Sequence, residues 1–539
     1  MRIRHLLIAV AAGLALADAS IVTLALPDIL VDLHTTVDGV AAVIGIYTVV
    51  LVVTLIPVER LMRRIGPSHT GAAGLALFAI ASLGCAAANS LTVLLIARAI
   101  QALGGSAALM AAFSLLVAKR DARQLWLYAT VVASAVGPAL GGALTQAFDW
   151  QAIFVFQAPI GALAAVACLL ERDVVLPPRV KREPFRVVPA AALAMLSAAL
   201  SAVLFLLVLM LVAGWSEAPL RAAAAVTVIP AGALVGSRIK GRYVQLAAAG
   251  CLLVGGGVIA LALLPEPKLV WTLIPQALAG VGMGMALPSL AGGLLPERDS
   301  ADAASLLTLR HLGIAVILAI LAPLASHNLN TATERARERG VALVLDAPLD
   351  PLEKIKLAPA LLKGVDTTQD PRAGLRKAVA AHRTDVSEDE RTTYDKLGKR
   401  ADETLTDAVA EAFRPAFIVT GVLALIAALL LLLPPPWLAL GAATVTIAGY
   451  ALLHATIAPE PVKIQDPCKP RNVPSAGGIT GFLQGQALKL LDSTACRLHA
   501  SREELVLALA DEQDRKRFQE KYGVDVRSLS SVLGSLISG

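Results

Sequence analysis

Long runs of apolar residues, separated by short polar segments, extend along most of the chain. Each run holds about 20 residues, which is the length that an α-helix needs to cross a bilayer. Strands of a transmembrane barrel would alternate apolar and polar positions, and these runs do not. The pattern therefore predicts an all-α membrane protein with thirteen spans. They are expected at residues 6–27, 38–57, 70–88, 92–116, 124–146, 151–170, 188–213, 218–237, 246–264, 269–291, 303–325, 414–433 and 438–457.

The two ends of this series need separate interpretation. Met1 to His5 and the apolar run behind it resemble a signal peptide, but the run is about 20 residues long and other spans follow. We therefore expect an uncleaved first helix. At the other end, residues 414–457 as one helix would measure about 66 Å at roughly 1.5 Å per residue, twice a bilayer. A turn at Pro434 to Trp437 is expected to divide them into two spans.

Composition narrows the class of protein. Of the 539 residues, 56% are hydrophobic and only 16% are charged, and the mean hydropathy is +0.70. A soluble domain has roughly a quarter charged residues. These values exclude a soluble enzyme, a nucleic-acid binder and a disordered protein as descriptions of the whole chain.

The basic residues predict the orientation, because cytoplasmic loops of membrane proteins retain Lys and Arg. With a cytoplasmic N-terminus, the outside loops contain only Arg221 and Lys268 and are otherwise acidic. The inside loops then contain Arg2, Arg4, Arg60, Arg63, Arg64, Lys119, Arg120, Arg123, Arg172, Arg179, Lys181, Arg182, Arg186, Arg238, Lys240, Arg242 and Arg298. We expect the plasma (inner) membrane as the location, with an insertion at 326–412 outside. The tail after Ala458 is also expected outside, because the number of spans is odd.

Cysteine positions agree with an outside tail. Cys85, Cys168 and Cys251 lie in apolar spans and are interpreted as small buried hydrophobic residues. Cys468 and Cys496 both lie in the tail, and one pair in an oxidising compartment favours a disulfide. Two free thiols in a cytoplasmic tail remain the alternative.

Five stretches carry the functional signal. The first span contains Asp18 to Pro27 (DASIVTLALP), and Glu59 to Gly66 (ERLMRRIG) follows the second span. Arg98 to Gly104 (RAIQALG) lies in the fourth span, and Gly137 to Gly142 (GPALGG) in the fifth. Trp150 to Gly161 (WQAIFVFQAPIG) opens the sixth span.

Together these motifs resemble the major facilitator superfamily, and within it the drug–proton antiporter branch with fourteen helices. The resemblance covers most of residues 6–325 and 404–433, and it implies two six-helix bundles. We expect an additional thirteenth span, a helical extracytoplasmic insertion and a C-terminal helical module. The expected divisions are an N-terminal bundle at 1–170, a cytoplasmic linker at 171–187, a C-terminal bundle at 188–433 interrupted by 326–412, the thirteenth span at 434–457, and a disulfide-stapled module at 458–539.

Two features depart from this branch. Its two central extra helices are absent, since a basic linker connects the sixth span directly to the seventh. The cytoplasmic motif of the family is Gly-x-Leu-x-Asp-Arg-x-Gly, and here Glu59 and Arg63 replace its Gly and Asp. The resemblance assigns gating to Glu59, Arg63, Arg64 and Gly66. Glu59 is one helical turn from Arg63 or Arg64, which allows a new ion pair.

Asp18 is the single residue that says most about function. It lies about 14 Å from the outer end of its helix, at roughly 1.5 Å per residue. A carboxyl group at such a depth is costly and normally faces a cavity or a partner. Arg98 lies at a comparable depth in the fourth span. The pair is either a proton-coupling site whose carboxylate changes its affinity for protons, or a permanent ion pair that holds two helices together.

Other polar residues within the spans are candidates for the substrate cavity. Gln101, Gln157, Tyr47 and Gln276 are suited to orient a polar head group, or alternatively to form interhelical hydrogen bonds. The resemblance makes Gly137, Pro138, Gly141 and Gly142 a hinge of alternating access. Arg310, near the inner end of the eleventh span, is interpreted as snorkelling to the interface. No Cys or acid stands at ligand spacing from His311, so no metal is expected there.

The sequence contains no nucleotide-binding loop, no serine-hydrolase motif and no metal-ligand spacing, so we expect neither an enzyme nor a cofactor. The prediction is a secondary exporter of a lipophilic or lipid-like amphiphile, coupled to protons through Asp18. A multidrug/proton antiporter and a transport-inactive receptor or assembly scaffold are the alternatives. Expected partners are the lipophilic substrate, protons, membrane lipids and an extracytoplasmic envelope protein, and no nucleic acid.

The insertion and the tail are expected to be helical. Residues 331–341 prolong the eleventh span and residues 400–413 lead into the twelfth, with short amphipathic helices at 351–362 and 374–382 between them. In the tail we expect helices at 477–491, 513–522 and 528–537. Ser501 and Glu504 predict a capping box that opens a further helix. The tail is interpreted as a docking module for the insertion or for an envelope partner, or as a passive lid.

Overall fold

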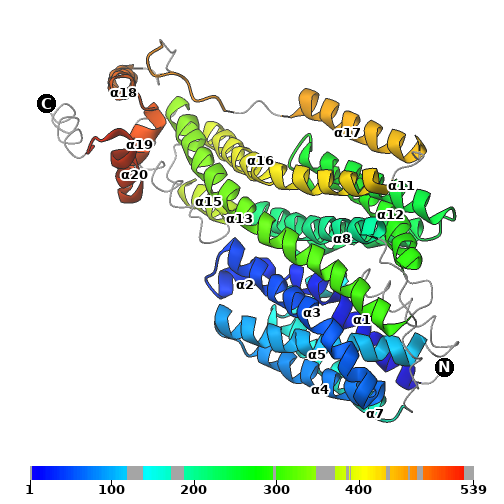
Figure 1. The fold of residues 1–539 in the computed structure, drawn as a ribbon. Helices are drawn as coiled ribbons and strands as arrows, with labels where there is room; N and C mark the ends of the chain where they lie inside the picture. The colour runs from blue at the N-terminus through cyan, green and yellow to red at the C-terminus, as the bar shows by residue number, and fades with distance from the viewer. Residues whose placement is uncertain are drawn as a thin grey trace. The chain divides into compact units, whose positions relative to one another are not determined.

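The computed structural model describes residues 3–117, 137–171, 187–294, 299–347, 371–383, 388, 390–431, 437–458, 462–469 and 478–526. These residues form helices and no strands (Figure 1). The helices are α1 (Ile3–Thr23), α2 (Leu26–Asp32), α3 (Val37–Ile65), α4 (Pro67–Ala86), α5 (Leu91–Val117), α7 (Gln151–Leu169), α8 (Val187–Val208), η1 (Leu209–Gly214), α9 (Pro219–Val226), α10 (Val228–Gly236), α11 (Tyr243–Ala262), α12 (Leu269–Leu294), α13 (Ser300–Asp346), α15 (Pro371–His382), α16 (Arg391–Leu431), α17 (Trp437–Ile457), α18 (Gly478–Arg497), α19 (Arg502–Ala510) and α20 (Glu512–Tyr522).

The predicted spans are present where the structure describes them. Within the described residues, 12 helices are long and apolar enough to cross a membrane. The fifth predicted span lies partly outside the described residues, and its described part, residues 137–147, is helical. The predicted helices at 351–362 and 528–537 and most of the linker at 171–187 also lie outside the described residues.

Two spans are less regular than the hydrophobic pattern predicts. The first helix ends at Thr23, and the short α2 begins anew at Leu26, where Pro27 takes one of the first helical positions. The eighth span is divided into α9 and α10 at Thr227. Pro230 explains this break, because a proline removes the hydrogen bond to the carbonyl of residue i−4, which here is Val226.

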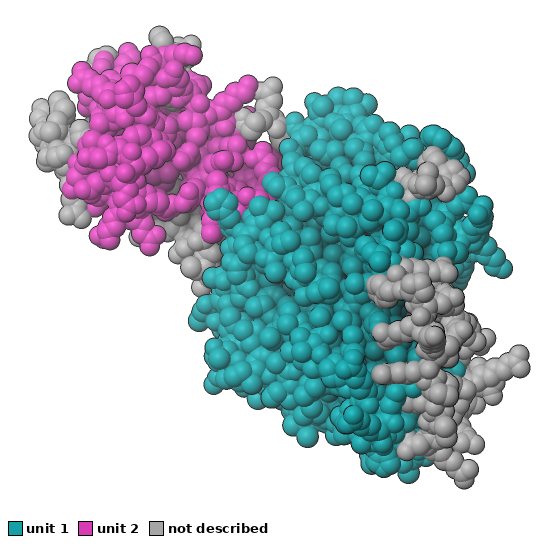
Figure 2. All heavy atoms as spheres, viewed as in Figure 1, with its two compact units in different colours: residues 1–213, 217–327, 413–458 teal, residues 214–216, 328–412, 459–539 magenta. Residues whose placement is uncertain are grey.

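Two compact units make up the described chain (Figure 2). Unit 1 comprises residues 1–213, 217–327 and 413–458 and therefore holds the spans. Unit 2 comprises residues 214–216, 328–412 and 459–539. The insertion and the tail thus belong to one unit. α13 and α16 extend well beyond a bilayer, with 47 and 41 residues, which confirms that the insertion prolongs the eleventh and twelfth spans.

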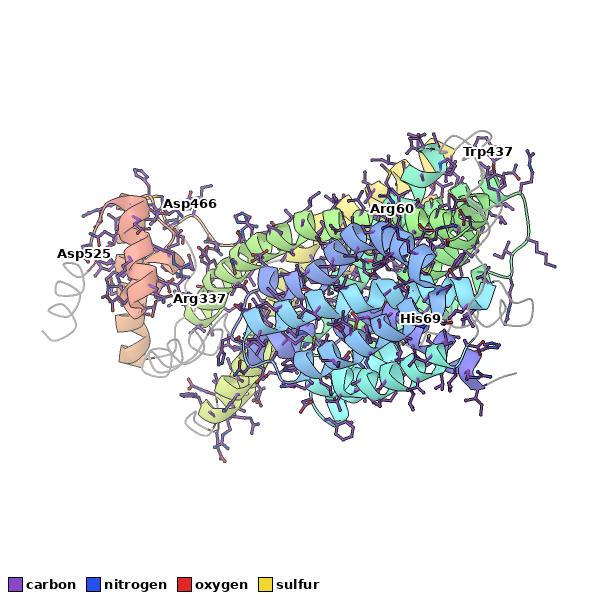
Figure 3. All side chains as sticks on the ribbon, turned by 60° about the horizontal axis from the view of Figure 1, so that its bottom comes forward. Arg60, His69, Arg337, Trp437, Asp466 and Asp525 are labelled. Atoms are coloured by element: carbon purple, nitrogen blue, oxygen red, sulfur yellow. A yellow bond between two sulfur atoms is a disulfide. The ribbon has the colours of Figure 1, made fainter. Side chains whose placement is uncertain are left out.

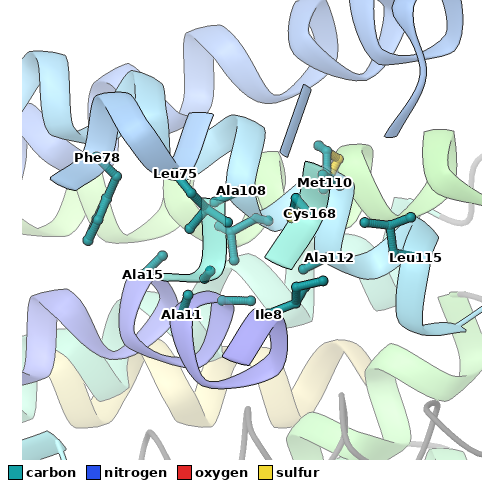
Figure 4. Packing of buried hydrophobic residues seen from close by; sticks show 14 of the residues in the cluster. Ile8, Ala11, Ala15, Leu75, Phe78, Ala108, Met110, Ala112, Leu115 and Cys168 are labelled. Atoms are coloured by element: carbon teal, nitrogen blue, oxygen red, sulfur yellow. The ribbon is translucent and has the colours of Figure 1, made fainter. Parts of the chain in front are cut away.

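Small residues allow the helices of unit 1 to pack closely. In the N-terminal half, a Cβ added at Gly104 would lie 2.6 Å from the carbonyl oxygen of Gly74, so α4 and α5 meet backbone to backbone. Apolar side chains such as Leu75, Ala108 and Cys168 fill the adjoining core (Figure 4). In the C-terminal half, a Cβ at Gly284 would overlap the carbonyl oxygen of Ala233.

The thirteenth span, α17, packs against α11 on one side. The nearest approach is at Gly256, where an added Cβ would lie 2.8 Å from Ala443. Tyr450 Oη donates to the Trp271 carbonyl oxygen at 2.7 Å. Trp437, at the start of the helix, is 72% exposed (Figure 3), as expected for an aromatic side chain in a membrane interface.

Unit 2 has small apolar cores and a covalent staple. Leu375, Tyr394 and Leu405 pack together with α13 in the insertion, while Leu505 and Phe518 pack among the tail helices. The predicted disulfide between Cys468 and Cys496 is present. The predicted capping box of Ser501 and Glu504 opens α19. Gly523 ends α20 with a φ of 71°, a left-handed conformation that favours glycine.

Candidate functional site

The polar cluster of the N-terminal half is built around one ion pair. Asp18 on α1 and Arg98 on α5 are both fully buried, and Arg98 Nη2 lies 2.6 Å from Asp18 Oδ2. The predicted pairing of these two residues is therefore present. A carboxylate and a guanidinium at this distance neutralise each other in a fully buried site, where either charge alone would be expensive.

Two glutamines close a ring of hydrogen bonds with this pair. Arg98 Nη1 donates to Gln101 Oε1 at 2.6 Å, and Gln101 Nε2 donates to Gln157 Oε1 at 2.9 Å. Gln157 Nε2 in turn donates to Asp18 Oδ1 at 3.1 Å. Because Arg98 and Gln101 are three residues apart, they share one face of α5, and α7 supplies Gln157. We call these four residues the polar ring.

Further groups hold the polar ring in place. The ring of Tyr47 lies 4.4 Å from the Arg98 guanidinium carbon, a cation–π contact, and Tyr47 Oη donates to the Ala15 carbonyl oxygen at 3.0 Å. Arg98 Nε donates to the Val43 carbonyl oxygen at 3.3 Å. Ser82 on α4 accepts from Gln101 Nε2 at 2.8 Å. Sequence analysis missed Ser82, because a serine in an apolar helix carries no signal of its own.

Gln276 does not belong to the polar ring: it lies far from these residues in the sequence and forms its hydrogen bond elsewhere. It is on α12 in the C-terminal half, is fully buried, and donates from Nε2 to Thr272 Oγ1 of the same helix at 2.8 Å. The other predicted cavity residues are hydrogen-bonded to one another or stacked, so the structure brings Tyr47, Gln101 and Gln157 together without Gln276.

A second charged group connects the end of α3 to the start of α13. Glu59 pairs with Arg63 one turn later, as the sequence allowed. Arg63 Nη2 also lies 2.6 Å from Asp299 Oδ1, and Ser300 Oγ donates to Glu59 Oε1 at 2.9 Å. We call Glu59, Arg63, Asp299 and Ser300 the latch. The sequence did not identify Asp299, which stands 236 residues from its partner.

The remaining motif residues have distinct surroundings. Arg64 is exposed. Gly66 joins α3 to α4 with a φ of 92°, which L-residues with a side chain rarely adopt. A Cβ at Gly141 would overlap the Ile21 carbonyl oxygen, and one at Gly142 would lie 3.0 Å from the Pro219 carbonyl oxygen on the C-terminal half.

Gly137 packs against the same helix as Gly141, with an added Cβ 3.5 Å from Ala17. Pro138 is buried beside it. The Gly137 to Gly142 segment therefore lies against α1 next to Asp18. Among the described residues, no group of three or more His, Cys, Asp or Glu side chains is arranged to hold a metal ion.

Curated relatives match part of the chain. The methylenomycin A resistance protein of Bacillus subtilis is 35% identical over 170 residues, which are 30% of this chain and 36% of that protein. The multidrug resistance protein Stp of Mycobacterium tuberculosis is 32% identical over 170 residues, which are 30% of this chain and 32% of that protein. The chain thus spans about a third of the length of these relatives.

Solved structures and a family model extend the comparison. A bacterial homologue of the human lysosomal transporter Spinster, solved in an inward-facing, unoccupied conformation, superposes with a TM-score of 0.56 at 16% identity, over 83% of this chain and 97% of that one. At this identity the match concerns the fold. The model of the Major Facilitator Superfamily matches residues 8–322, more than half of the chain. The protein is therefore a member of the Major Facilitator Superfamily.

Proposed function

We propose that the protein is a proton-coupled exporter of a lipophilic or lipid-like amphiphile, working by alternating access. The polar ring is the observation that supports this most directly, because it places a carboxylate that can bind a proton inside the spans. The names of the relatives, which include resistance and multidrug resistance proteins, favour export. Membership in a transporter family favours a carrier over an enzyme.

The bonding of Asp18 suggests how a proton would act. With Asp18 ionised, its two oxygens face Arg98 and Gln157. A proton on Asp18 would cancel its charge and leave Arg98 without a counter-ion, which is unstable in a buried site. Arg98 would then need water or another acceptor. Proton binding therefore favours a conformation in which the cavity is open to water.

The latch supplies a contact that alternating access would break and remake. It joins the end of α3 in the N-terminal half to the start of α13 in the C-terminal half. The predicted orientation puts this end of the spans at the cytoplasm, so the latch would close the inner side. Asp299→Asn should weaken it and increase inward opening, measured by the spin-label distance between the inner ends of α3 and α13. Arg60→Gln, at an exposed residue of the same helix, is the matched control and should leave that distance unchanged.

Unit 2 fits the proposed topology. Arg337 on α13 binds Asp514 on α20 at 2.8 Å, which supports a common side of the membrane for the insertion and the tail. We propose that this side is extracytoplasmic, because the disulfide favours an oxidising compartment. Unit 2 then stands outside the cell as a module that receives substrate or binds an envelope partner.

The substrate is proposed to be an amphiphile because the two halves differ. The N-terminal half offers the polar ring, whereas Leu204 to Val212 of the C-terminal half is unbroken hydrocarbon. The second candidate function, multidrug/proton antiport, is favoured by the names of the relatives. A transport-inactive scaffold is the third.

Transport in proteoliposomes separates these functions. Purified protein with an imposed proton gradient should move a fluorescent lysophospholipid, and Asp18→Asn should abolish the effect of the gradient. Asp38→Asn, at an exposed residue of α3, is the matched control and should behave as the wild type. Transport of ethidium but not of the lysophospholipid would favour the multidrug function. No transport of either probe would favour the scaffold.

A further inference from the structure

Arg310 on α13 differs from Arg98, the buried arginine of the polar ring, in having no partner among the residues that the structure describes. Among the described residues, neither an ion pair nor a hydrogen bond holds its guanidinium. No carboxylate there lies close enough to compensate the cost of burying its charge. The adjacent His311 offers no negative charge, and its Nδ1 already lies 2.7 Å from the Leu307 carbonyl oxygen. Arg98, by contrast, forms an ion pair with Asp18 and donates hydrogen bonds to Gln101 and to the Val43 carbonyl oxygen.

The position of Arg310 along α13 argues against the snorkelling that the sequence suggested. Arg310 is ten residues beyond Ser300, where the latch closes, and this corresponds to about 15 Å at roughly 1.5 Å per residue. An arginine side chain does not cover this distance. The residue is nevertheless only half-buried, and its nitrogens are not among the sealed polar atoms of the interior. Its guanidinium therefore faces an open space within the spans.

The rotation of α13 shows which space this is. Ser300, Ala304 and Leu307 face the N-terminal half, through the Glu59 hydrogen bond and the apolar core of that half. Gly313 faces α8, because a Cβ there would overlap the Ala194 carbonyl oxygen. With about 100° per residue, Arg310 lies about 60° around the helix axis from Leu307 and about 60° from Gly313. It therefore points between the two halves, where a carrier of this fold holds its substrate.

We propose that Arg310 binds the oxyanionic head group, carboxylate or phosphate, of the amphiphile that the protein transports. An arginine presents a planar fork of donors that matches both anions with two parallel hydrogen bonds. An intramembrane cation without a protein counter-ion is costly, and a bound anion removes this cost. This inference rests on the proposed export of an amphiphile and specifies the charge of its head group.

Binding to purified protein in a neutral maltoside detergent tests the inference. The probes are dodecyl phosphate, dodecanoate, the uncharged dodecyl glucoside and inorganic phosphate, each titrated by thermophoresis. Arg310→Gln should lower the affinity for dodecyl phosphate and for dodecanoate by at least about tenfold, because a charge-assisted pair is lost. The affinity for dodecyl glucoside should stay unchanged. Arg221→Gln, at an exposed arginine of the same half (73% exposed), is the matched control and should change no affinity.

Every other outcome of these titrations either supports or overturns the assignment of Arg310. Arg310→Lys keeps the charge without the fork, so it should bind the anions with intermediate affinity, and it replaces Arg310→Gln if that variant does not fold. Equal anion affinity in wild type and Arg310→Gln, or an equal loss for dodecyl glucoside, would overturn the assignment. Inorganic phosphate that binds as tightly as dodecyl phosphate would refute an amphiphile. Because the assay uses no gradient, failure of proton-coupled export leaves its result unaffected.

Discussion

Different interactions hold the helices together in unit 1 and in unit 2. In unit 1, helices meet through glycines such as Gly104 and Gly284, and the polar ring is sealed and neutral. In unit 2, long side chains form ion pairs that reach the surface, such as Arg383 with Asp395. A capping box and a disulfide complete it.

The difference follows from the surroundings of each unit. Lipid gives no hydrophobic reason for helices to associate, so close packing and satisfied polar groups must hold the spans together. Water does supply that reason, but the apolar cores of unit 2 are small, and a staple compensates for a small core. The same chain therefore contains two kinds of stability that respond to different perturbations.

Removal of one charge from the polar ring should have the largest effect. Arg98→Gln leaves Asp18 as a buried charge without its counter-ion, which costs about 3–5 kcal/mol. We expect a large loss of thermal stability in detergent for this variant. The double variant Asp18→Asn with Arg98→Gln removes both charges and should recover most of that stability without recovering proton-dependent transport. An unchanged melting temperature for Arg98→Gln would contradict the buried, neutral ring.

Loss of the disulfide should cause the second-largest loss of stability, and this loss should be confined to unit 2. The Cys468–Cys496 bond closes a loop of 28 residues, for which the chain-entropy estimate is about 3–4 kcal/mol. Cys468→Ser with Cys496→Ser should therefore make residues 478–526 sensitive to limited proteolysis while the spans keep their stability. A reductant should reproduce this in wild type and add nothing in the double variant. Equal destabilisation of both units would show that they are not independent.

Overpacking of unit 1 should have an intermediate effect. In Gly284→Ala the new methyl group overlaps the Ala233 carbonyl oxygen, so α10 and α12 must separate. Such strain costs about 1–3 kcal/mol, measured as a lower melting temperature. Gly441→Ala on α17 is the control, because its added Cβ meets nothing within 4 Å, and it should be neutral or slightly stabilising. If Gly284→Ala were equally neutral, close approach would not be what holds this pair of helices.

The smallest effect is expected from a pH-dependent group in unit 2. Burial, and then the charge of Glu504, raise the pKa of Glu338 from 4.5 to about 7. Lys521 opposes this shift, and Glu334 and Glu503 add to it. Folded unit 2 therefore binds this proton more tightly than the unfolded chain. The stability linked to it is fully present below pH 4.5 and is lost as the pH rises through about 7.

Glu338→Gln tests this linkage by removing the titration. At pH 8 the variant should exceed wild type in the stability of unit 2 by about 1 kcal/mol, a value reduced because the group is half-exposed. At pH 5 the two should be equal. The measurement is the proteolysis rate of unit 2 as a function of pH, with Glu403→Gln on the exposed side as control. A constant difference between pH 5 and pH 8 would contradict the linkage.

Much of the fold was predictable because its signals are local. Apolar runs gave the spans, and residues such as Ser501 and Glu504 marked a helix start by their spacing alone. The pairing of Asp18 with Arg98 followed from their similar depth. The closed polar ring did not follow, because it depends on how α1, α5 and α7 are rotated against one another.

Contacts between distant segments were beyond the sequence. Asp299 lies in a short loop whose charge has no periodic context, so nothing indicated that it would meet Arg63. The tail meets the insertion through the Arg337–Asp514 and Arg502–Asp346 pairs, a contact that was only one of three alternatives at the level of the sequence. Arg310 was placed near an interface from its position in the run, because the sequence does not show which side of a long helix is wet.

The composition of unit 2 from separated segments has a consequence for its biosynthesis. When residue 412 leaves the ribosome, 90 residues remain to be made before Arg502 follows, which takes roughly 5–18 s at about 5–20 residues per second. During this time two further spans are inserted, and Asp346 has not yet gained its ion-pair partner Arg502. Truncation of the tail therefore does more than delete a module. It leaves the insertion permanently at the stage that it normally passes through within seconds.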